Sequence, residues 1–172
     1  MRSAFLTVVF VAALASVAGC ALSTVRWRGD WHPELSVTGP IFVLVAPGPA
    51  LPPDRAHFSD QLLKLVREIE PNAEPVQGNQ DAASRLAFQR GGRFLLVATV
   101  RRWRDAQTQY YGEPDSIALT VRLLQLQPAA LIREFELEAN SPRLAVRDTP
   151  ADRLLGAKFR DAVRRLLSGP NP

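Results

Sequence analysis

The sequence predicts an α/β (α+β) fold, a two-layer sandwich in which about three helices cover a mixed, mostly antiparallel sheet. Three observations predict this class. Continuous apolar runs at residues 41–46 and 94–100 are typical of buried strands, and apolar residues at steps of three and four predict helices. Two alternating segments, at residues 117–123 and 131–139, predict an antiparallel pair.

The first half of the domain predicts a strand, a helix, a short extended piece and a second helix. Residues 41–46 carry no polar side chain and therefore predict a central strand that is buried on both faces. Asp54 and Pro71 are start and stop signals for the first helix, and Asp81 is the expected N-cap of a second helix through Arg90. The apolar face of the first helix is expected to comprise Phe58, Leu62, Leu65, Val66 and Ile69.

The second half predicts three strands and a helix. Residues 94–100 predict a strand that runs on to Arg104, and the two alternating strands after it are each expected to have one buried and one wetter face. Residues 127–130 are short enough to connect those two strands as a hairpin. The last helix is expected to be capped at Thr149 and to end at Ser168. Its apolar stripe is Leu155, Phe159, Ala162, Val163 and Leu166.

The N-terminus predicts export. A cationic start precedes the uncharged apolar run of residues 4–19, which is typical of a secretory signal and shorter than the roughly 20 residues of a transmembrane helix. The run ends in Val17, Ala18, Gly19 and Cys20, which resembles the lipobox of bacterial lipoproteins. That resemblance implies cleavage before Cys20 and attachment of palmitate-type acyl chains to it. The alternative is an ordinary signal peptide or an uncleaved anchor in which Cys20 is incidental.

The expected organisation is a signal peptide at residues 1–19, a lipidated N-terminus and tether at residues 20–40, and one domain at residues 41–169. In the tether, Trp27 either lies at the lipid head groups with its flanking arginines or packs on the domain as part of a first strand. Ala21 stands where aspartate would favour inner-membrane retention, so the lipoprotein resemblance implies the outer membrane, facing the periplasm. Export and a net charge of only +4 make nucleic acid an unsuitable partner.

A second resemblance rests on residues 94–124. After the strand at residues 94–100 come Trp103, Asp105, Thr108, Gly112, Pro114 and Asp115. This pattern resembles the bacterial lipoprotein family of domain of unknown function 4823, whose members carry an arginine after the aspartate and a serine before the glycine. Here Ala106 and Tyr111 occupy those two positions. The resemblance implies an envelope lipoprotein and no particular chemistry.

The segment from Trp103 to Asp115 is the candidate ligand or partner loop. It presents an aromatic ring and two carboxylates, those of Asp105 and Asp115, between two strands. The alternative is turn chemistry, because aspartate, glycine and proline are common turn residues and the tryptophan can cover the end of the sheet. The sequence favours turn chemistry.

Two charged groups have both a functional and a structural interpretation. Glu134, Glu136 and Glu138 lie on one strand face, but side chains two residues apart are about 6 to 7 Å apart, too far to share one cation without other ligands. A solvated face paired with arginines such as Arg122 is the better interpretation, so no metal and no cofactor are expected. The cations of the last helix can bind anionic lipid or a cell-envelope polymer, or they simply form its solvated face.

Catalysis has little support in the sequence. There are two histidines, His32 and His57, and the sequence has no Gly-x-Ser-x-Gly nucleophile elbow, no His-Glu-x-x-His zinc motif and no phosphate-binding glycine loop. The expected function is therefore a non-enzymatic binding or scaffolding module of the cell envelope, held to the membrane by its lipid and acting on an envelope protein or polymer. The alternative is a lipid-anchored hydrolase of peptidoglycan or glycan with a cleft lined by Asp105, Asp115 or Glu113.

Overall fold

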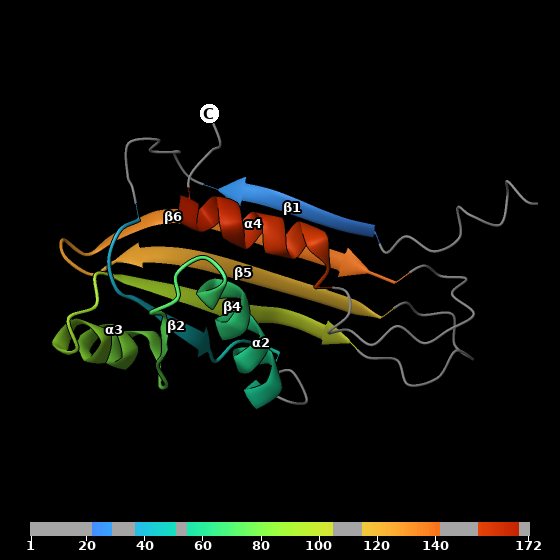
Figure 1. Cartoon of the computed structure of the whole chain (residues 1–172). Coiled ribbons are helices and arrows are strands. Elements are labelled where there is room, and N and C mark those ends of the chain that lie inside the picture. The colour runs from blue at the N-terminus through green and yellow to red at the C-terminus, as the bar shows by residue number, and fades with distance from the viewer. Residues whose placement is uncertain (1–21, 29–36, 51–54, 105–114, 142–154, 169–172) are drawn as a thin grey trace, which may run out of the picture.

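Strands and helices alternate in the first half of the chain, and three strands follow one another in the second (Figure 1). The computed structural model describes residues 22–28, 37–50, 55–104, 115–141 and 155–168. In chain order the elements are β1 (Leu22–Arg28), β2 (Ile41–Ala46), α2 (Arg55–Arg67), β3 (Glu74–Pro75), α3 (Gln80–Gln89), β4 (Phe94–Arg104), β5 (Ser116–Gln125), β6 (Ala130–Asn140) and α4 (Ala157–Ser168). The six strands form one mixed sheet in the order β1-β6-β5-β4-β2-β3, which confirms the predicted fold class.

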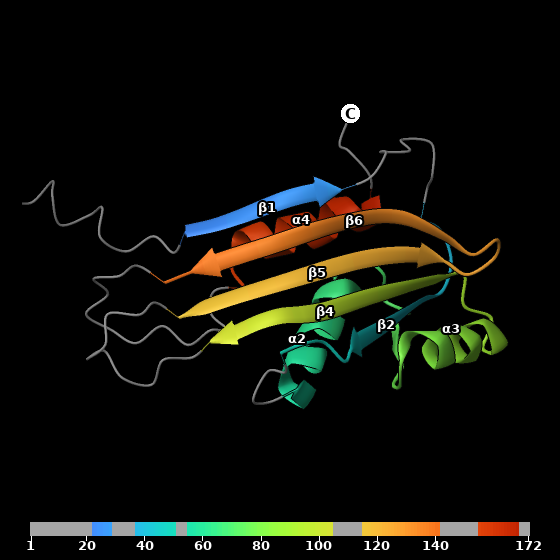
Figure 2. The ribbon, with the colours of Figure 1, turned by 180° about the vertical axis from the view of Figure 1, so that it is seen from behind.

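The parallel part of the sheet consists of β2, β3 and β4, which two helical crossover connections join. β2 pairs in parallel with β3 and with β4. α2 crosses one face of the sheet between β2 and β3, and α3 crosses the opposite face between β3 and β4 (Figures 1 and 2). All six residues of β2 are buried as predicted, because helices cover both of its faces. β2 is an interior strand between β4 and β3, one place from the edge of the sheet, because β3 has only two residues and forms that edge.

The larger core lies between the sheet and the two helices α2 and α4. β4 and β5 each contribute every second residue to it, and in β5 the alternation of the sequence predicts this. β6 contributes Ile132, Phe135, Leu137 and Ala139, because a register shift interrupts its alternation. Aromatic rings connect the layers: the ring centroid of Phe135 lies 6.2 Å from that of Phe159 on α4, and the ring of Phe58 on α2 lies 6.0 Å from that of Trp103. The buried residues of α4 are Phe159, Ala162, Val163, Leu166 and Leu167.

A smaller core lies on the opposite face, under α3. The buried residues of this helix are Ala83 and Ala87, whose small side chains let it approach Phe42 and Leu95 of the sheet. α3 covers only the neighbourhood of β2 and the first half of β4. Within the described residues, no helix covers β5, β6 and β1 on this face (Figure 2).

Residues 22–28 correct the predicted tether, because they form the edge strand β1. β1 pairs with β6 in antiparallel register from Leu22 opposite Asn140 to Arg28 opposite Glu134. The ring of Trp27 packs against Phe135, with centroids 5.3 Å apart. The alternative in which Trp27 belongs to a first strand is therefore the one that the structure shows.

Two helix starts also differ from the predictions. The N-cap of α3 is Asn79 rather than Asp81, because the Asn79 side chain accepts a hydrogen bond of 2.9 Å from the backbone N–H of Ala82. α4 begins at Ala157, where the carbonyl of Gly156 accepts the first bonds, and the predicted cap Thr149 lies outside the described residues. The longest described helix has 13 residues. Within the described part of the chain, no helix combines the length and the apolar character needed to cross a membrane.

Candidate functional site

The uncovered sheet face, made of the outward residues of β1, β6, β5 and the end of β4, is a polar surface; we call it the open face. Glu134, Glu136 and Glu138 lie on it, and the register places Arg26 and Thr120 beside Glu136. The arginines that the register and the ion pairs place on it are Arg26, Arg28, Arg101, Arg102, Arg104 and Arg122. The open face is therefore cationic, with six guanidinium groups and three carboxylates among these residues.

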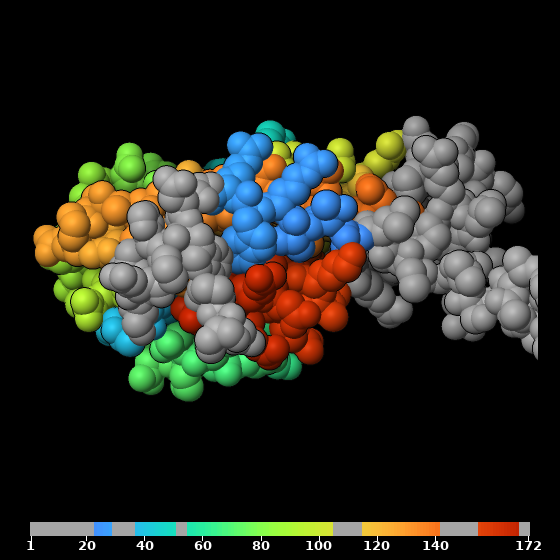
Figure 3. All heavy atoms as spheres, turned by 90° about the horizontal axis from the view of Figure 1, so that it is seen from above, coloured from blue at the N-terminus to red at the C-terminus, as the bar shows by residue number. Residues whose placement is uncertain are grey.

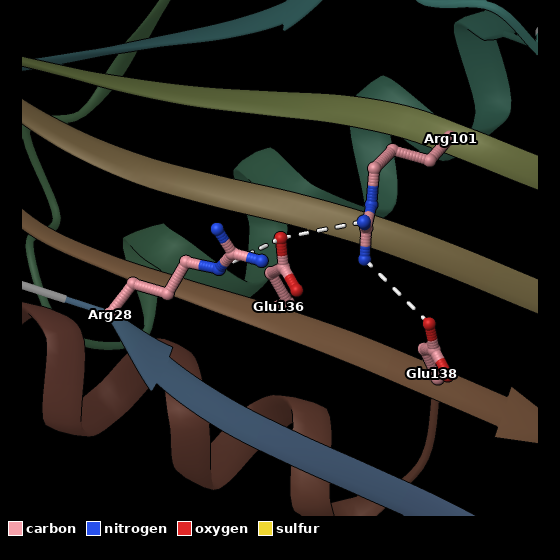
Figure 4. A network of polar contacts seen from close by, with 4 residues as sticks. All are labelled: Arg28, Arg101, Glu136 and Glu138. Carbon is pink, nitrogen blue, oxygen red and sulfur yellow. Dashed lines mark ion pairs between the residues drawn. The ribbon is translucent and has the colours of Figure 1, made fainter.

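A network of ion pairs crosses this face from β4 to β1 (Figure 4). Oε1 of Glu136 lies 3.1 Å from Nε of Arg28 and 3.4 Å from Nη1 of Arg101. Nη2 of Arg101 lies 3.9 Å from Oε1 of Glu138. The Glu136 side chain is only 12% exposed, because the two arginines cover it, whereas that of Glu138 is 47% exposed. Glu136 is thus the centre of the network.

A bulge in β4 positions Arg101. The register between β4 and β5 shifts between Val100 and Arg102, and Arg101 is the extra residue. The loop after β2 packs on this point: the N–H of Ala50 donates to the carbonyl of Val100 over 3.4 Å, and a Cβ on Gly48 would overlap the same oxygen. The bulge lets Arg101 extend across β5 and reach β6. The predicted pairing of the glutamates with arginines is confirmed, but the sequence did not single out Arg101, because a bulge leaves no mark in the sequence pattern.

The glutamates show no sign of a cation site. Glu136 and Glu138 are engaged by arginines, and Glu134 is flanked in the register by Arg28 and Arg122. In the described segments no group of three or more His, Cys, Asp or Glu residues is arranged to hold a metal ion. Arg122 reaches away from the glutamates, and its Nη2 donates to Oε1 of Gln80 over 2.9 Å.

The structure places the two ends of the predicted partner loop. Trp103 is half-buried and packs edge-on against Phe58. Asp115 is 6% exposed and fixes the start of β5: its N–H donates to Oγ of Ser141, and its carbonyl accepts from the N–H of Ser141, each over 2.9 Å. The other predicted members, Asp105, Thr108, Gly112 and Pro114, lie outside the described residues, as do Glu113, the lipobox residues and Cys20.

Several cations of α4 have structural partners. Nζ of Lys158 donates to the carbonyl of Ser23 over 2.7 Å, and the guanidinium of Arg165 lies 5.9 Å from the ring centroid of Trp27. These contacts hold α4 beside the edge strand β1, and the two elements lie next to each other at the surface (Figure 3). The wet face of this helix is thus partly used to fix β1.

A groove that the sequence did not reveal runs between α3 and the β5–β6 hairpin. Its volume is about 590 Å³, and its wall includes Phe88 and Leu131, which are 46% and 52% exposed. Leu124 and Leu126 form an apolar floor, and Asp81 and Arg85 are on its rim. A second groove of about 340 Å³ lies between α2 and α4. Neither groove is lined by a pair of carboxylates.

An open mixed sheet with two helices on one face and one on the other defines this chain as a single-sheet α+β protein. Its structure is similar to that of a variant of PelC, a dodecamer from Paraburkholderia phytofirmans, with a TM-score of 0.66 and 14% identity over 86% of this chain and 99% of that one. A second PelC dodecamer structure gives a TM-score of 0.58 and 16% identity over 72% and 85% of the two chains. At these identities the similarity shows the fold.

The chain also has a weaker similarity to lipoprotein GNA1162 from Neisseria meningitidis, with a TM-score of 0.45 and 11% identity over 76% of this chain and 99% of that one. No family model matches the sequence, and the comparison with curated proteins gave no match. The resemblance to the family of domain of unknown function 4823 therefore stays a prediction.

Proposed function

We propose that this chain is a lipid-anchored envelope protein whose single domain, starting at β1, binds or scaffolds an envelope component through the open face. One observation carries the binding role: helices cover one face of the sheet, while β1, β5 and β6 expose an ordered array of arginine and glutamate side chains on the other. Side chains fixed by one another lose little conformational freedom when a partner binds, which favours recognition.

The anchor in this proposal is Cys20. It rests on the apolar signal-like run and on the lipobox pattern that ends in this residue, the sole cysteine of the sequence. Two acyl-type anchors hold a protein durably to a bilayer, whereas one chain does not. The location at the outer membrane, facing the periplasm, is part of the same proposal, because Ala21 stands where aspartate would favour retention in the inner membrane.

Metabolic labelling tests the anchor. In cells grown with labelled palmitate, the wild-type chain is expected to incorporate the label and the Cys20→Ala variant is expected to incorporate none. A Ser23→Ala variant is the matched control, because it alters a small residue three positions away and keeps the thiol. Equal labelling of Cys20→Ala and wild type would overturn the lipoprotein proposal.

Site-specific photocrosslinking tests the open face. A photoreactive residue at Thr24, which is exposed on this face, is expected to give a crosslinked envelope component in intact cells. The same residue at Lys64, exposed on α2, is the control and is expected to give none. The crosslink should weaken at least severalfold in an Arg26→Glu variant, because this change reverses one of the exposed charges. An unchanged crosslink in that variant contradicts binding through this face.

The hydrolase remains the alternative function, and Asp115 does not favour it. This residue is buried and its backbone is bonded to Ser141, which suits the start of a strand. A hydrolase would release soluble fragments from peptidoglycan, and Asp105→Asn or Glu113→Gln would abolish that release. Fragment release that depends on either residue would replace the binding proposal by the enzymatic one.

A second proposal is self-assembly, which the fold similarity to the PelC dodecamer favours. That similarity extends over 99% of the PelC chain. Light scattering of the purified chain is expected to give a multiple of the 19.0 kDa chain mass, less the signal peptide. A monomer mass at all concentrations would overturn self-assembly and leave the binding role untouched.

A further inference from the structure

The strand register brings one end of the sheet next to the proposed lipid anchor. β1 begins at Leu22, two residues after Cys20, and an extended chain of two residues spans at most about 7 Å. Leu22 pairs with Asn140, Asn140 with Ser116, and Ser116 with Arg104. The start of β1, the end of β6, the start of β5 and the end of β4 therefore lie at a single end of the sheet, the right-hand end in Figure 1.

Exposed cations gather at this end. Arg102 and Arg104 are exposed at the end of β4, and Lys158 is exposed at the start of α4, where its Nζ reaches the carbonyl of Ser23. The nearest described carboxylates are those of Glu138, which faces Arg101, and of Asp115, which is buried. Among the described residues at this end, the exposed cations outnumber the exposed carboxylates.

We infer that this end of the sheet is a second membrane contact, in which Arg102, Arg104 and Lys158 bind the anionic head groups of the bilayer that holds the lipid. The inference rests on the proposed anchor at Cys20. β4 lies three strands from β1, about 14 Å at the usual strand spacing. A sheet that stands with this end on the membrane therefore keeps Arg104 close to the head groups, within reach of a surface potential that decays over about 8 to 10 Å.

The same geometry excludes the head-group role expected for Trp27. Five residues of strand separate Leu22 from Trp27, about 17 Å along β1, and the indole packs on Phe135. The contact with the membrane is thus assigned to residues that are more than 80 positions from Cys20 in the sequence. In this orientation the strands run away from the membrane, and the open face stands perpendicular to the bilayer plane, where a periplasmic partner can reach it.

Energy transfer to labelled head groups tests the contact on the full lipidated chain in vesicles. Cys20 is the sole cysteine and lipidation blocks its thiol, so an introduced cysteine alone takes the dye. Ala157→Cys places the dye at the near end and Ala129→Cys at the far end, both at exposed positions. In vesicles of phosphatidylglycerol and phosphatidylcholine, transfer from position 157 is expected to exceed that from position 129 at least about twofold, because a ten-residue strand spans about 33 Å.

The contact predicts that this ratio depends on charge. The ratio should fall towards one in vesicles of phosphatidylcholine alone or in the double variant Arg102→Gln/Arg104→Gln, because each change removes one side of the charge attraction. It should also fall in about 1 M salt, where the Debye length is only about 3 Å. The matched control Arg85→Gln/Arg90→Gln removes the same charge from exposed positions on and just after α3 and should leave the ratio unchanged. A ratio that responds to none of these changes overturns the contact. Failure of the wild type to bind phosphatidylcholine vesicles overturns the anchor, and the contact with it.

Discussion

Arg101 of β4 reaches across the neighbouring strand β5 and pairs with Glu136 of β6, with 3.4 Å between Nη1 and Oε1. Ala118 and Thr120 lie between them in the register, and their short side chains leave room for the guanidinium group. Arg28 pairs with the same carboxylate from the other side, over 3.1 Å. One partly buried carboxylate thus connects three strands on a face where the described residues form no helix.

Glu136→Gln is expected to lower the free energy of unfolding by about 1 to 2 kcal/mol, because it leaves two partly covered arginines without their shared carboxylate. Denaturant unfolding measures the change. Glu138→Gln is the matched control and should change the free energy by less than about 0.5 kcal/mol, since that side chain is half exposed and its pair distance is 3.9 Å. Equal effects of the two changes would contradict a network centred on Glu136.

Trp27→Ala is expected to lower the free energy of unfolding by about 3 kcal/mol, because the indole loses its packing on Phe135 and its contact with Arg165. Hydrogen exchange should show loss of protection in β1 before the rest of the sheet. Arg26→Gln changes an exposed residue of the same strand and should be nearly neutral. A neutral Trp27→Ala would mean that residues 22–28 act as a tether after all.

Gly92→Ala is expected to destabilise the fold by about 1 to 3 kcal/mol, because the new Cβ would lie 2.6 Å from Cδ2 of Phe42 and 2.7 Å from the carbonyl oxygen of Ala87. Thermal unfolding measures it. Gly91→Ala is the matched change one residue earlier, where a Cβ meets no atom within 4 Å but φ is +79°. Its cost should be the backbone cost alone, about 1 to 2 kcal/mol. A larger effect at Gly91 than at Gly92 would contradict the close packing of Phe42.

Arg133→Ala is expected to release the last turn of α4. Nη1 of Arg133, a residue 3% exposed, donates to the carbonyl of Leu166 over 2.9 Å. Burial lowers the pKa of the Arg133 guanidinium, which shows that its charge is held at a desolvation cost. Because truncation leaves a buried carbonyl without this donor, the free energy of unfolding should fall by about 2 to 3 kcal/mol.

Hydrogen exchange at Leu166 and Leu167 separates this local effect from general destabilisation. Arg164→Ala, whose exposed side chain pairs with Asp161 over 3.7 Å, is the control and should leave the exchange of that turn within experimental error. Normal protection of Leu166 in Arg133→Ala would show that the turn does not depend on this bond.

The sequence predicted most of the elements from local patterns. The apolar run of β2, the alternation in β5 and β6 and the apolar stripe of α2 each depend on whether a side chain meets the core or water, and this is visible residue by residue. Helix starts were predicted less well, because Asn79 and Asp81 are both good caps and the choice between them depends on the loop from β3. The sequence left open whether residues 22–28 form a strand, because only Val25 and Trp27 of this segment pack against the core.

The candidate site depended more on the tertiary structure. Glu134, Glu136 and Glu138 were assigned to one face from their spacing, and the structure confirms that placement. Their partner Arg101 could not be found, since a bulge turns it towards a strand that is not its neighbour. The loop from Trp103 to Asp115 and the lipid on Cys20 stay predictions.

The sequence by itself determined the periodicity of most of the segments after residue 40, and with it which of their residues face the core. It did so because burial follows local spacing in each element. Only the tertiary structure decided that β1 closes the sheet beside β6, that Arg28 and Arg101 meet at Glu136, and that Arg104 lies at the same end of the sheet as Leu22. These relationships join residues far apart in the chain, and strand order and register, which no local pattern encodes, bring them together.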